Sequence, residues 1–223
     1  MSHQVRAITL LGVNCYLVKT GSGHILIDTG WPFKRAGLDK ELENAGCKPG
    51  SLELIILTHG DFDHSGNAAY LRDKYGARIA MHHRESEMVE KGDMILSRKD
   101  RSILKRIVMG GIKLYGRLSK FDRFKPDLCI DEESDLSGYG FDARVVDLPG
   151  HSIGSIGILT GDGDLFCGDL VMHDRPALHS LTDDAADLRA SAEKVISLGV
   201  KTVYPGHGSP FPPELLTGAG LDQ

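Results

Sequence analysis

Short apolar runs, each closed by a turn signal, dominate the first third of the chain. Their alternating or continuous apolar character predicts strands at 5–10, 15–20, 24–27, 54–57 and 78–82. The run Leu54-Ile55-Ile56-Leu57 has no polar interruption, which is typical of a strand buried on both faces of a sheet. Between these strands, the spacing of Leu38, Leu42 and Ala45 predicts one helix, and the pattern from Asn67 to Tyr75 predicts another.

The second half of the chain has the same kind of pattern. It predicts strands at 127–130, 143–148, 155–159, 164–167 and 202–204, and a helix over 185–198. Strands that recur in both halves with helices between them predict an α/β fold, in which two sheets pack together with helices outside. A length of 223 residues suits a single domain over 1–223, large enough to bury a core of its own.

The segment 94–125 differs from the rest because it has almost no strand character. It predicts helices interrupted by Gly110-Gly111, and 10 of the 26 Lys and Arg residues lie in it. We interpret it as a basic helical insertion, for which three interpretations remain open. The pattern favours a solvated amphipathic helix pair packed on the core. The alternatives are a cap that attracts an anionic substrate and a helix lying on a membrane surface.

Charge and cysteine content narrow the function classes. A formal net charge of -5 gives no general attraction to nucleic acid or to acidic membranes. No run approaches the roughly 20 apolar residues that a membrane span needs. The four cysteines form no C-x-x-C pair, so a reduced, intracellular chain is the simplest interpretation. We therefore expect a cytoplasmic protein that acts on a small molecule, without a nucleic-acid partner, and leave a homo-oligomer open.

A dense cluster of metal-ligand residue types follows the buried run 54–57. His59, Asp61, Asp63 and His64 fall within six residues, and imidazole and carboxylate groups suit zinc, iron or manganese. If this segment stays extended, alternate positions along it point the same way. One such residue alone would be interpreted as a helix cap or a polar loop. The density favours a metal site, because each of three more ligand-type residues follows a predicted strand: His151, Asp169 and His207.

These motifs resemble those of the metallo-β-lactamase superfamily, in its glyoxalase II-like or metal-dependent hydrolase branch. The matching segments are His59-Gly60-Asp61-Phe62-Asp63-His64, Pro149-Gly150-His151, Gly168-Asp169 and Pro205-Gly206-His207-Gly208. The segments 14–18 and 25–30 also resemble the opening strands of the family, so the resemblance runs from about residue 8 to 208. It implies an αββα sandwich, in which two mixed sheets pack together and helices cover their outer faces.

The resemblance also implies two divalent metal ions, with zinc expected first and iron or manganese as alternatives. One ion would be held by His59, Asp61 and His151. The other would be held by Asp63, His64 and His207, with Asp169 as the bridge between the two. Asp63 would also act as a proton acceptor. Asp28 would lie behind the ligands and orient one of them or a water. A turn or cap role is the alternative, and both interpretations can be true together.

Asp61 departs from the family pattern, which usually has His at this position. A carboxylate is an anionic, harder ligand that favours harder metals. The flavodiiron oxidases of the same superfamily resemble this chain more closely, with Glu at that position and iron bound. Three outcomes remain open: a normal two-metal site, an iron-containing site, or one weak site that empties easily.

The predicted chemistry is hydrolysis. Two neighbouring ions lower the pKa of a water, and the resulting hydroxide attacks carbon or phosphorus. We expect a small ester, thioester, lactone or phosphoester as substrate. The alternatives are an iron-dependent oxidoreductase, flavodiiron- or sulfur-dioxygenase-like, and a binding module with structural metals. His173 and Arg175 are candidate substrate contacts, with an exposed polar turn as the equal alternative, and Cys167 is expected to be a buried, inert thiol.

Overall fold

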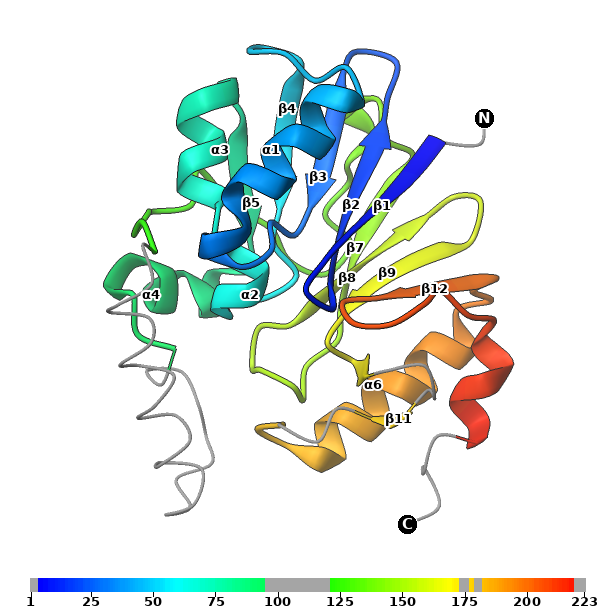
Figure 1. Ribbon diagram of the computed structural model, residues 1–223. Coiled ribbons are helices and arrows are strands. Elements are labelled where there is room, and N and C mark those ends of the chain that lie inside the picture. Colours follow the sequence, from blue (N-terminus) through cyan, green and yellow to red (C-terminus); the bar gives the residue numbers. More distant parts are fainter. Residues whose placement is uncertain (1–3, 95–120, 173–176, 179–181, 219–223) are drawn as a thin grey trace.

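The computed structural model describes residues 4–94, 121–172, 177–178 and 182–218 of the chain. The first sheet has six strands in the order β1-β2-β3-β4-β5-β6 (Figure 1). Strands β1 to β3 are antiparallel, and β3 to β6 are parallel. Their bounds are Gln4–Leu10, Val13–Lys19, His24–Ile27, Leu52–Ile56, Arg78–Met81 and Leu128–Cys129.

The second sheet has four strands in the order β12-β9-β8-β7. Strands β7, β8 and β9 are antiparallel neighbours, and β12 lies parallel to β9. Their bounds, from β7 to β9 and then β12, are Ala143–Asp147, Ile156–Thr160, Asp164–Gly168 and Thr202–Pro205. Two short strands form a separate antiparallel pair, β10 at Val171–Met172 and β11 at Ala177–Leu178.

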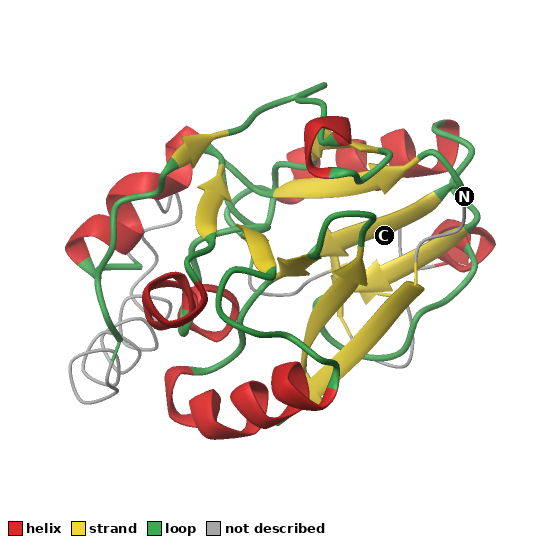
Figure 2. Ribbon diagram, turned by 90° about the horizontal axis from the view of Figure 1, so that it is seen from above, coloured by secondary structure: helices red, strands yellow, loops and turns green. Residues whose placement is uncertain are grey.

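The helices lie outside the two sheets, with the strands between them (Figure 2). The α-helices α1, α2, α3, α4 and α6 span Arg35–Asn44, Phe62–Ser65, Ala68–Tyr75, His83–Lys91 and Ala185–Ser197. Three 3₁₀ turns, η1 to η3, span Pro32–Lys34, Ser137–Tyr139 and Pro213–Gly218. Local signals fix some of the ends: α3 ends at Gly76 with φ of 75°, and the Asp184 side chain caps the first turn of α6.

Alternation along the strands separates three apolar layers. In β2, Tyr16 and Val18 point between the sheets, whereas Cys15 and Leu17 point to the outer layer under α1 and α3. The layer between the sheets also contains residues of β4 and of the second sheet, such as Leu54, Ile56, Val145, Ile158 and Phe166. A third layer packs α6 on the outer face of the second sheet. The predicted helix–sheet–sheet–helix sandwich is therefore confirmed.

The structure departs from the sequence pattern at two places. The segment after His59 does not stay extended, because α2 begins at Phe62 and places Asp63 and His64 in a helical turn. Helix α4 was not predicted, because its sequence is mostly charged and its apolar stripe is confined to Met88 and Val89. Within the described residues, the predicted strands and helices occur within a few residues of their expected bounds, although β6 is shorter than 127–130.

Of the predicted insertion at 94–125, only Met94 and residues 121–125 are described. Phe121 packs on Phe62 of α2, with ring centroids 4.5 Å apart, and Arg35 pairs with Asp122 at 2.6 Å. The rest of the insertion lies outside the described residues, so the single domain with a basic helical insertion stays a prediction.

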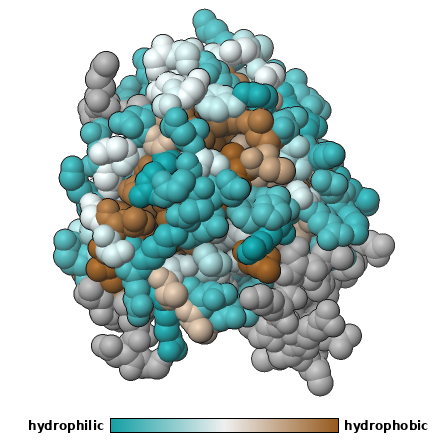
Figure 3. All heavy atoms as spheres, turned by 180° about the vertical axis from the view of Figure 1, so that it is seen from behind, coloured by the Kyte–Doolittle hydropathy of each residue, from teal (hydrophilic) through white to brown (hydrophobic). Residues whose placement is uncertain are grey.

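The described surface is mostly hydrophilic on the face in Figure 3, and apolar side chains show between the polar ones. Among the helices that the structure describes, none combines the length and apolar character needed to cross a bilayer. The four cysteines all belong to the described part and are free thiols.

Candidate metal centre

Four chain segments bring ligand-type side chains to one edge of the sandwich. His59 follows β4, His151 follows β7, Asp169 follows β9 and His207 follows β12. Strand ends leave their loops at the edge of a sheet, which explains why residues far apart in sequence meet there. All seven residues predicted as metal ligands belong to groups whose ligand atoms lie within 4.8 Å of one another.

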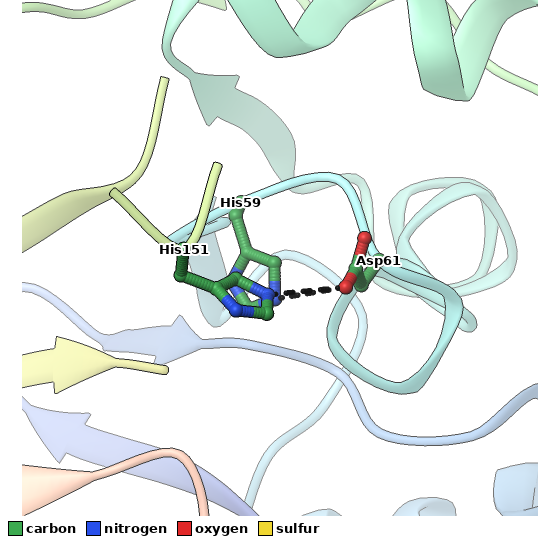
Figure 4. Close-up of side chains that lie close together, drawn as sticks. All are labelled: His59, Asp61 and His151. Atoms are coloured by element: carbon green, nitrogen blue, oxygen red, sulfur yellow. Dashed lines mark hydrogen bonds and ion pairs between the residues drawn. The ribbon is translucent and has the colours of Figure 1, made fainter. Parts of the chain in front are cut away.

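The first triad consists of His59, Asp61 and His151. Asp61 Oδ2 lies 3.7 Å from His59 Nε2 and 3.2 Å from His151 Nε2. In Figure 4 the two imidazoles and the carboxylate are turned toward one another. All three residues are buried, so this triad is largely shielded from water.

The second triad consists of Asp63, His64 and His207. Asp63 Oδ2 lies 3.8 Å from His64 Nε2 and 3.5 Å from His207 Nε2, and the two imidazole nitrogens are 3.4 Å apart. The Asp63 and His207 side chains are 17% and 19% exposed, whereas His64 is fully buried. This triad therefore has one deep member and two members that solvent reaches.

Asp169 lies between the triads. Its Oδ2 is 4.0 Å from His59 Nε2, 3.9 Å from His151 Nε2 and 3.5 Å from His207 Nε2, and its Oδ1 is 3.2 Å from His64 Nε2. Gly206, which precedes His207, leaves room for this carboxylate, because a Cβ at this position would lie 2.5 Å from Asp169 Oδ1. One carboxylate thus faces histidines from both triads.

Asp28 supports both triads from behind. It is buried, and its φ of 59° is in the left-handed region, which Asp tolerates better than most residues. Its Oδ2 accepts hydrogen bonds from His64 Nδ1 and from Thr58 Oγ1, both at 2.8 Å. Thr58 Oγ1 in turn lies 3.0 Å from His59 Nδ1 and accepts from it. These bonds hold both Nδ1 atoms protonated and direct Nε2 of each ring toward the centre.

His207 is positioned by the β1–β2 hairpin. Its Nδ1 donates to the carbonyl of Gly12 at 2.9 Å. Asn14 Nδ2 donates to the carbonyls of Pro205 at 2.9 Å and Gly208 at 2.7 Å, and the Tyr16 hydroxyl also donates to Pro205 O. The residues 14–18 carried the family resemblance, but the sequence did not indicate that Asn14 holds the loop of His207.

The electrostatics of the triads differ. Burial, followed by the nearby His64, lowers the pKa of His59 well below its usual value. Burial alone would lower the pKa of His64 too, but Asp169, Asp28 and Asp63 outweigh it and raise that pKa well above the usual value. Burial is likewise outweighed at His207, where hydrogen bonds to Asp169 and Asp63 raise the pKa to about 10. The carboxylates around the second triad thus favour the charged form of both of its histidines.

The residues present fit a metal ion at the first triad. His59 Nε2 is buried and has no hydrogen-bond partner among the described residues. A buried imidazole nitrogen without a partner costs free energy unless a ligand satisfies it. Its neighbours are nitrogen and carboxylate oxygen atoms, which are the donors that zinc, iron and manganese accept.

Two further residues that the structure describes, Cys167 and Ser152, make structural contacts. Burial raises the pKa of the Cys167 thiol, so the sulfur is an inert member of the core, as predicted. Ser152 bonds Ser155 within the His151 loop, with the two hydroxyl oxygens 2.7 Å apart. His173 and Arg175 lie outside the described residues, so their predicted substrate contacts stay predictions.

The comparison with family models matches the metallo-beta-lactamase superfamily over residues 8–207. The chain belongs to this superfamily. The predicted enzyme class, a metallo-hydrolase of the superfamily, is confirmed at the level of the class by relatives with hydrolase names.

Two curated relatives and two solved structures illustrate the similarity. The "Beta-lactamase-like protein 2 homolog" of Drosophila melanogaster is 27% identical over 91% of this chain, and the chain spans 61% of that protein. The "Acyl-coenzyme A thioesterase MBLAC2" of Bos taurus is 29% identical over 91% of this chain and 75% of that protein.

Among solved structures, "TTHA1623 in a di-iron-bound form" is 27% identical, with a TM-score of 0.70 over 97% of this chain and 98% of that one. The BLEG-1 B3 metallo-beta-lactamase shares the fold at 23% identity, with a TM-score of 0.73 over 100% and 97% of the two chains.

Proposed function

We propose that this chain is a two-metal hydrolase that cleaves thioesters of small acyl groups. The observation that carries the proposal is the convergence of seven ligand-type side chains into two triads around Asp169. His59, Asp61 and His151 would hold one ion, and Asp63, His64 and His207 the other. When bound, two such ions lower the pKa of a water toward neutrality and polarise the substrate oxygen.

The chain's own groups supply the remaining functions. Asp63 is partly exposed, and its Oδ2 lies near both imidazoles of the second triad, so it is placed to take a proton from an attacking water. Asp28 and Thr58 hold His64 and His59 in the tautomers that present Nε2. Asp169 balances the positive charge that the centre would gather between the triads.

The thioester is our choice among the ester, thioester, lactone and phosphoester classes because of the relatives. Two relatives, from Bos taurus and Homo sapiens, are named acyl-coenzyme A thioesterases, and both are 29% identical over 91% of this chain. Other relatives are named probable metallo-hydrolases, which supports hydrolysis without naming a substrate.

A substrate panel with metal-loaded protein tests the proposal. We expect acyl-coenzyme A thioesters to turn over faster than simple esters, lactones and phosphoesters, and turnover to vanish after chelation. The matched control is Asp169→Asn, which keeps the shape of the side chain and removes its charge. A protein that holds two ions and hydrolyses none of the four classes would overturn the proposal.

Iron-dependent oxidation is the second candidate, and it rests on Asp61. The carboxylate at this position favours a harder ion, and the similar TTHA1623 structure is titled as a di-iron-bound form. Metal analysis of the purified protein combined with oxygen consumption separates the candidates. Oxygen uptake with an electron donor or a sulfur substrate by the iron-loaded protein, without thioester turnover, would favour oxidation. A cytoplasmic location and a small-molecule substrate remain part of the proposal.

A further inference from the structure

Helix α4 carries a carboxyl group in its buried stripe. Glu85, Met88 and Val89 are its buried residues, whereas Glu87 and Glu90 of the same helix are exposed. Glu85 has no exposed surface at all. A buried carboxyl group costs free energy unless hydrogen bonds satisfy it, so the position of Glu85 calls for an explanation.

The two oxygens of Glu85 accept hydrogen bonds from two separate loops. Oε2 accepts from the backbone N–H of Gly60 at 3.1 Å, and Oε1 accepts from that of Gly154 at 2.9 Å. Gly60 lies between His59 and Asp61, and Gly154 lies three residues after His151. Glu85 thus links the two loops that supply the whole first triad.

The loops fit closely around this side chain. A Cβ on Gly154 would lie 2.8 Å from Glu85 Cγ and 3.0 Å from His82 Nδ1. A Cβ on Gly60 would lie 3.2 Å from Glu85 Oε2. Both glycines therefore let the backbone come close enough to donate to Glu85. A second link, from Ile156 N to Thr58 O at 2.9 Å, joins the same two loops elsewhere.

We propose that Glu85 is a positioning residue for the first metal ion, and that it acts on this ion alone. The inference rests on the proposed function, since it assumes that His59, Asp61 and His151 hold an ion. Its hydrogen bonds set the separation between the His59–Asp61 loop and the His151 loop. The second triad has supports of its own in Gly12 and Asn14, which hold His207 and its loop. Asp28 bonds His64 directly and reaches His59 only through Thr58.

The test compares Glu85→Gln in two backgrounds that each retain one triad. Gln keeps the size of the side chain, but its NH₂ group would face one of the two N–H donors. In the His207→Ala background, where the first triad remains, we expect Glu85→Gln to weaken cobalt(II) binding by roughly 10- to 100-fold, the usual effect of losing such a partner. In the His59→Ala background, where the second triad remains, we expect the affinity to change less than about twofold, because that triad does not use this partner.

A reciprocal variant tests whether the effect is specific to one triad. Asn14→Asp keeps the shape of the side chain but removes the donor to Pro205 O and Gly208 O. It should weaken cobalt(II) binding in the His59→Ala background and leave the cobalt(II) affinity of the His207→Ala background unchanged. Val89→Ala controls for damage to α4: we expect a lower melting temperature and unchanged cobalt(II) affinity in both backgrounds.

The outcomes separate this inference from the proposed function. If neither single-triad background binds cobalt(II) while the folded protein gives its normal circular dichroism, the proposed metal centre is wrong, and the role of Glu85 falls with it. If both backgrounds bind one ion and Glu85→Gln weakens both equally or neither, Glu85 is merely structural and only this inference is overturned. The inference is supported if Glu85→Gln weakens cobalt(II) binding only in the His207→Ala background and also changes the d–d absorption of the cobalt(II) bound there.

Discussion

The two triads contain the same kinds of side chain in different surroundings. The first is buried, its His59 has a lowered pKa, and the backbone donors bound to Glu85 brace its loops. The second is partly exposed, and carboxylates raise the pKa of both of its histidines. The same kinds of ligand side chain are thus held in place by buried loops in the first triad, whereas in the second triad neighbouring carboxylates set the charge of the histidines. Water and substrate would then reach the centre from the side of Asp63 and His207.

The largest effect should come from removing the negative charge of Asp169, which faces both triads. Asp169→Asn keeps a side chain of the same shape but takes away the negative charge that faces four histidines. We expect turnover to fall by more than roughly 100-fold, which exceeds the usual loss when a residue that only hydrogen-bonds a metal ligand is replaced. We also expect both ions to bind weakly. Calorimetric titration with zinc measures this. Loss of one ion only would show that the carboxylate serves a single triad.

Asp28→Asn should separate the triads. Asn also tolerates a positive φ, so the backbone at this position is preserved, but the amide accepts less strongly from His64 Nδ1. We expect the affinity of the second triad to fall by roughly 10- to 100-fold. The first triad, which Asp28 reaches only through Thr58, should lose less. Cobalt(II) titrations in the two single-triad backgrounds measure both affinities. A larger loss of affinity at the first triad would contradict the claim that Asp28 acts mainly on the second triad.

Proton release gives a third contrast. A metal ion needs neutral imidazole, so an ion that enters the second triad displaces protons from His64 and His207. Its affinity should rise about tenfold per pH unit for each proton displaced, up to about pH 10 for His207. His59, with its lowered pKa, adds no such dependence at the first triad. Calorimetry in two buffers of different ionisation enthalpy measures the release.

The same shift has a stability consequence in the metal-free protein. Because the pKa of His207 is raised from 6.5 to about 10 on folding, its contribution is complete below pH 6.5 and is lost as the pH rises through about 10. His207→Ala should therefore flatten the fall of the melting temperature over this pH range. Equal pH profiles in the two proteins would show that His207 is not held in its charged form.

The smallest effect concerns the choice of ion. Asp61→His replaces the anionic member of the first triad with a neutral, softer ligand. We expect the zinc-to-iron ratio of protein grown with both metals to rise several-fold, with the total number of ions unchanged. Elemental analysis of the purified protein gives the ratio. An unchanged ratio would mean that the surroundings, rather than Asp61, select the metal.

The sequence predicted most of the fold because apolar periodicity carries that information directly. The alternation in β2 and the continuous run in β4 mark strands that face two apolar layers, and both are found. Helix α4 was not predicted because one of its three buried residues is Glu85. With a charged residue on the buried face, the amphipathic pattern cannot be recognised in the sequence.

The candidate ligands could be predicted because their motifs are local in sequence. Their supports could not, since nothing along the chain distinguishes Glu85 from the exposed Glu87, or links Asn14 to a loop at 205–208. Only the three-dimensional contacts reveal that these residues serve different triads.

Counting the bound ions tests the central claim most directly. Native mass spectrometry of the reconstituted full chain should find two divalent ions in the unmodified protein. It should find one each in His59→Ala and His207→Ala, and no tightly bound ion when both substitutions are combined. A chain that binds no ion, or that keeps two ions in all of these variants, would contradict the two-metal centre.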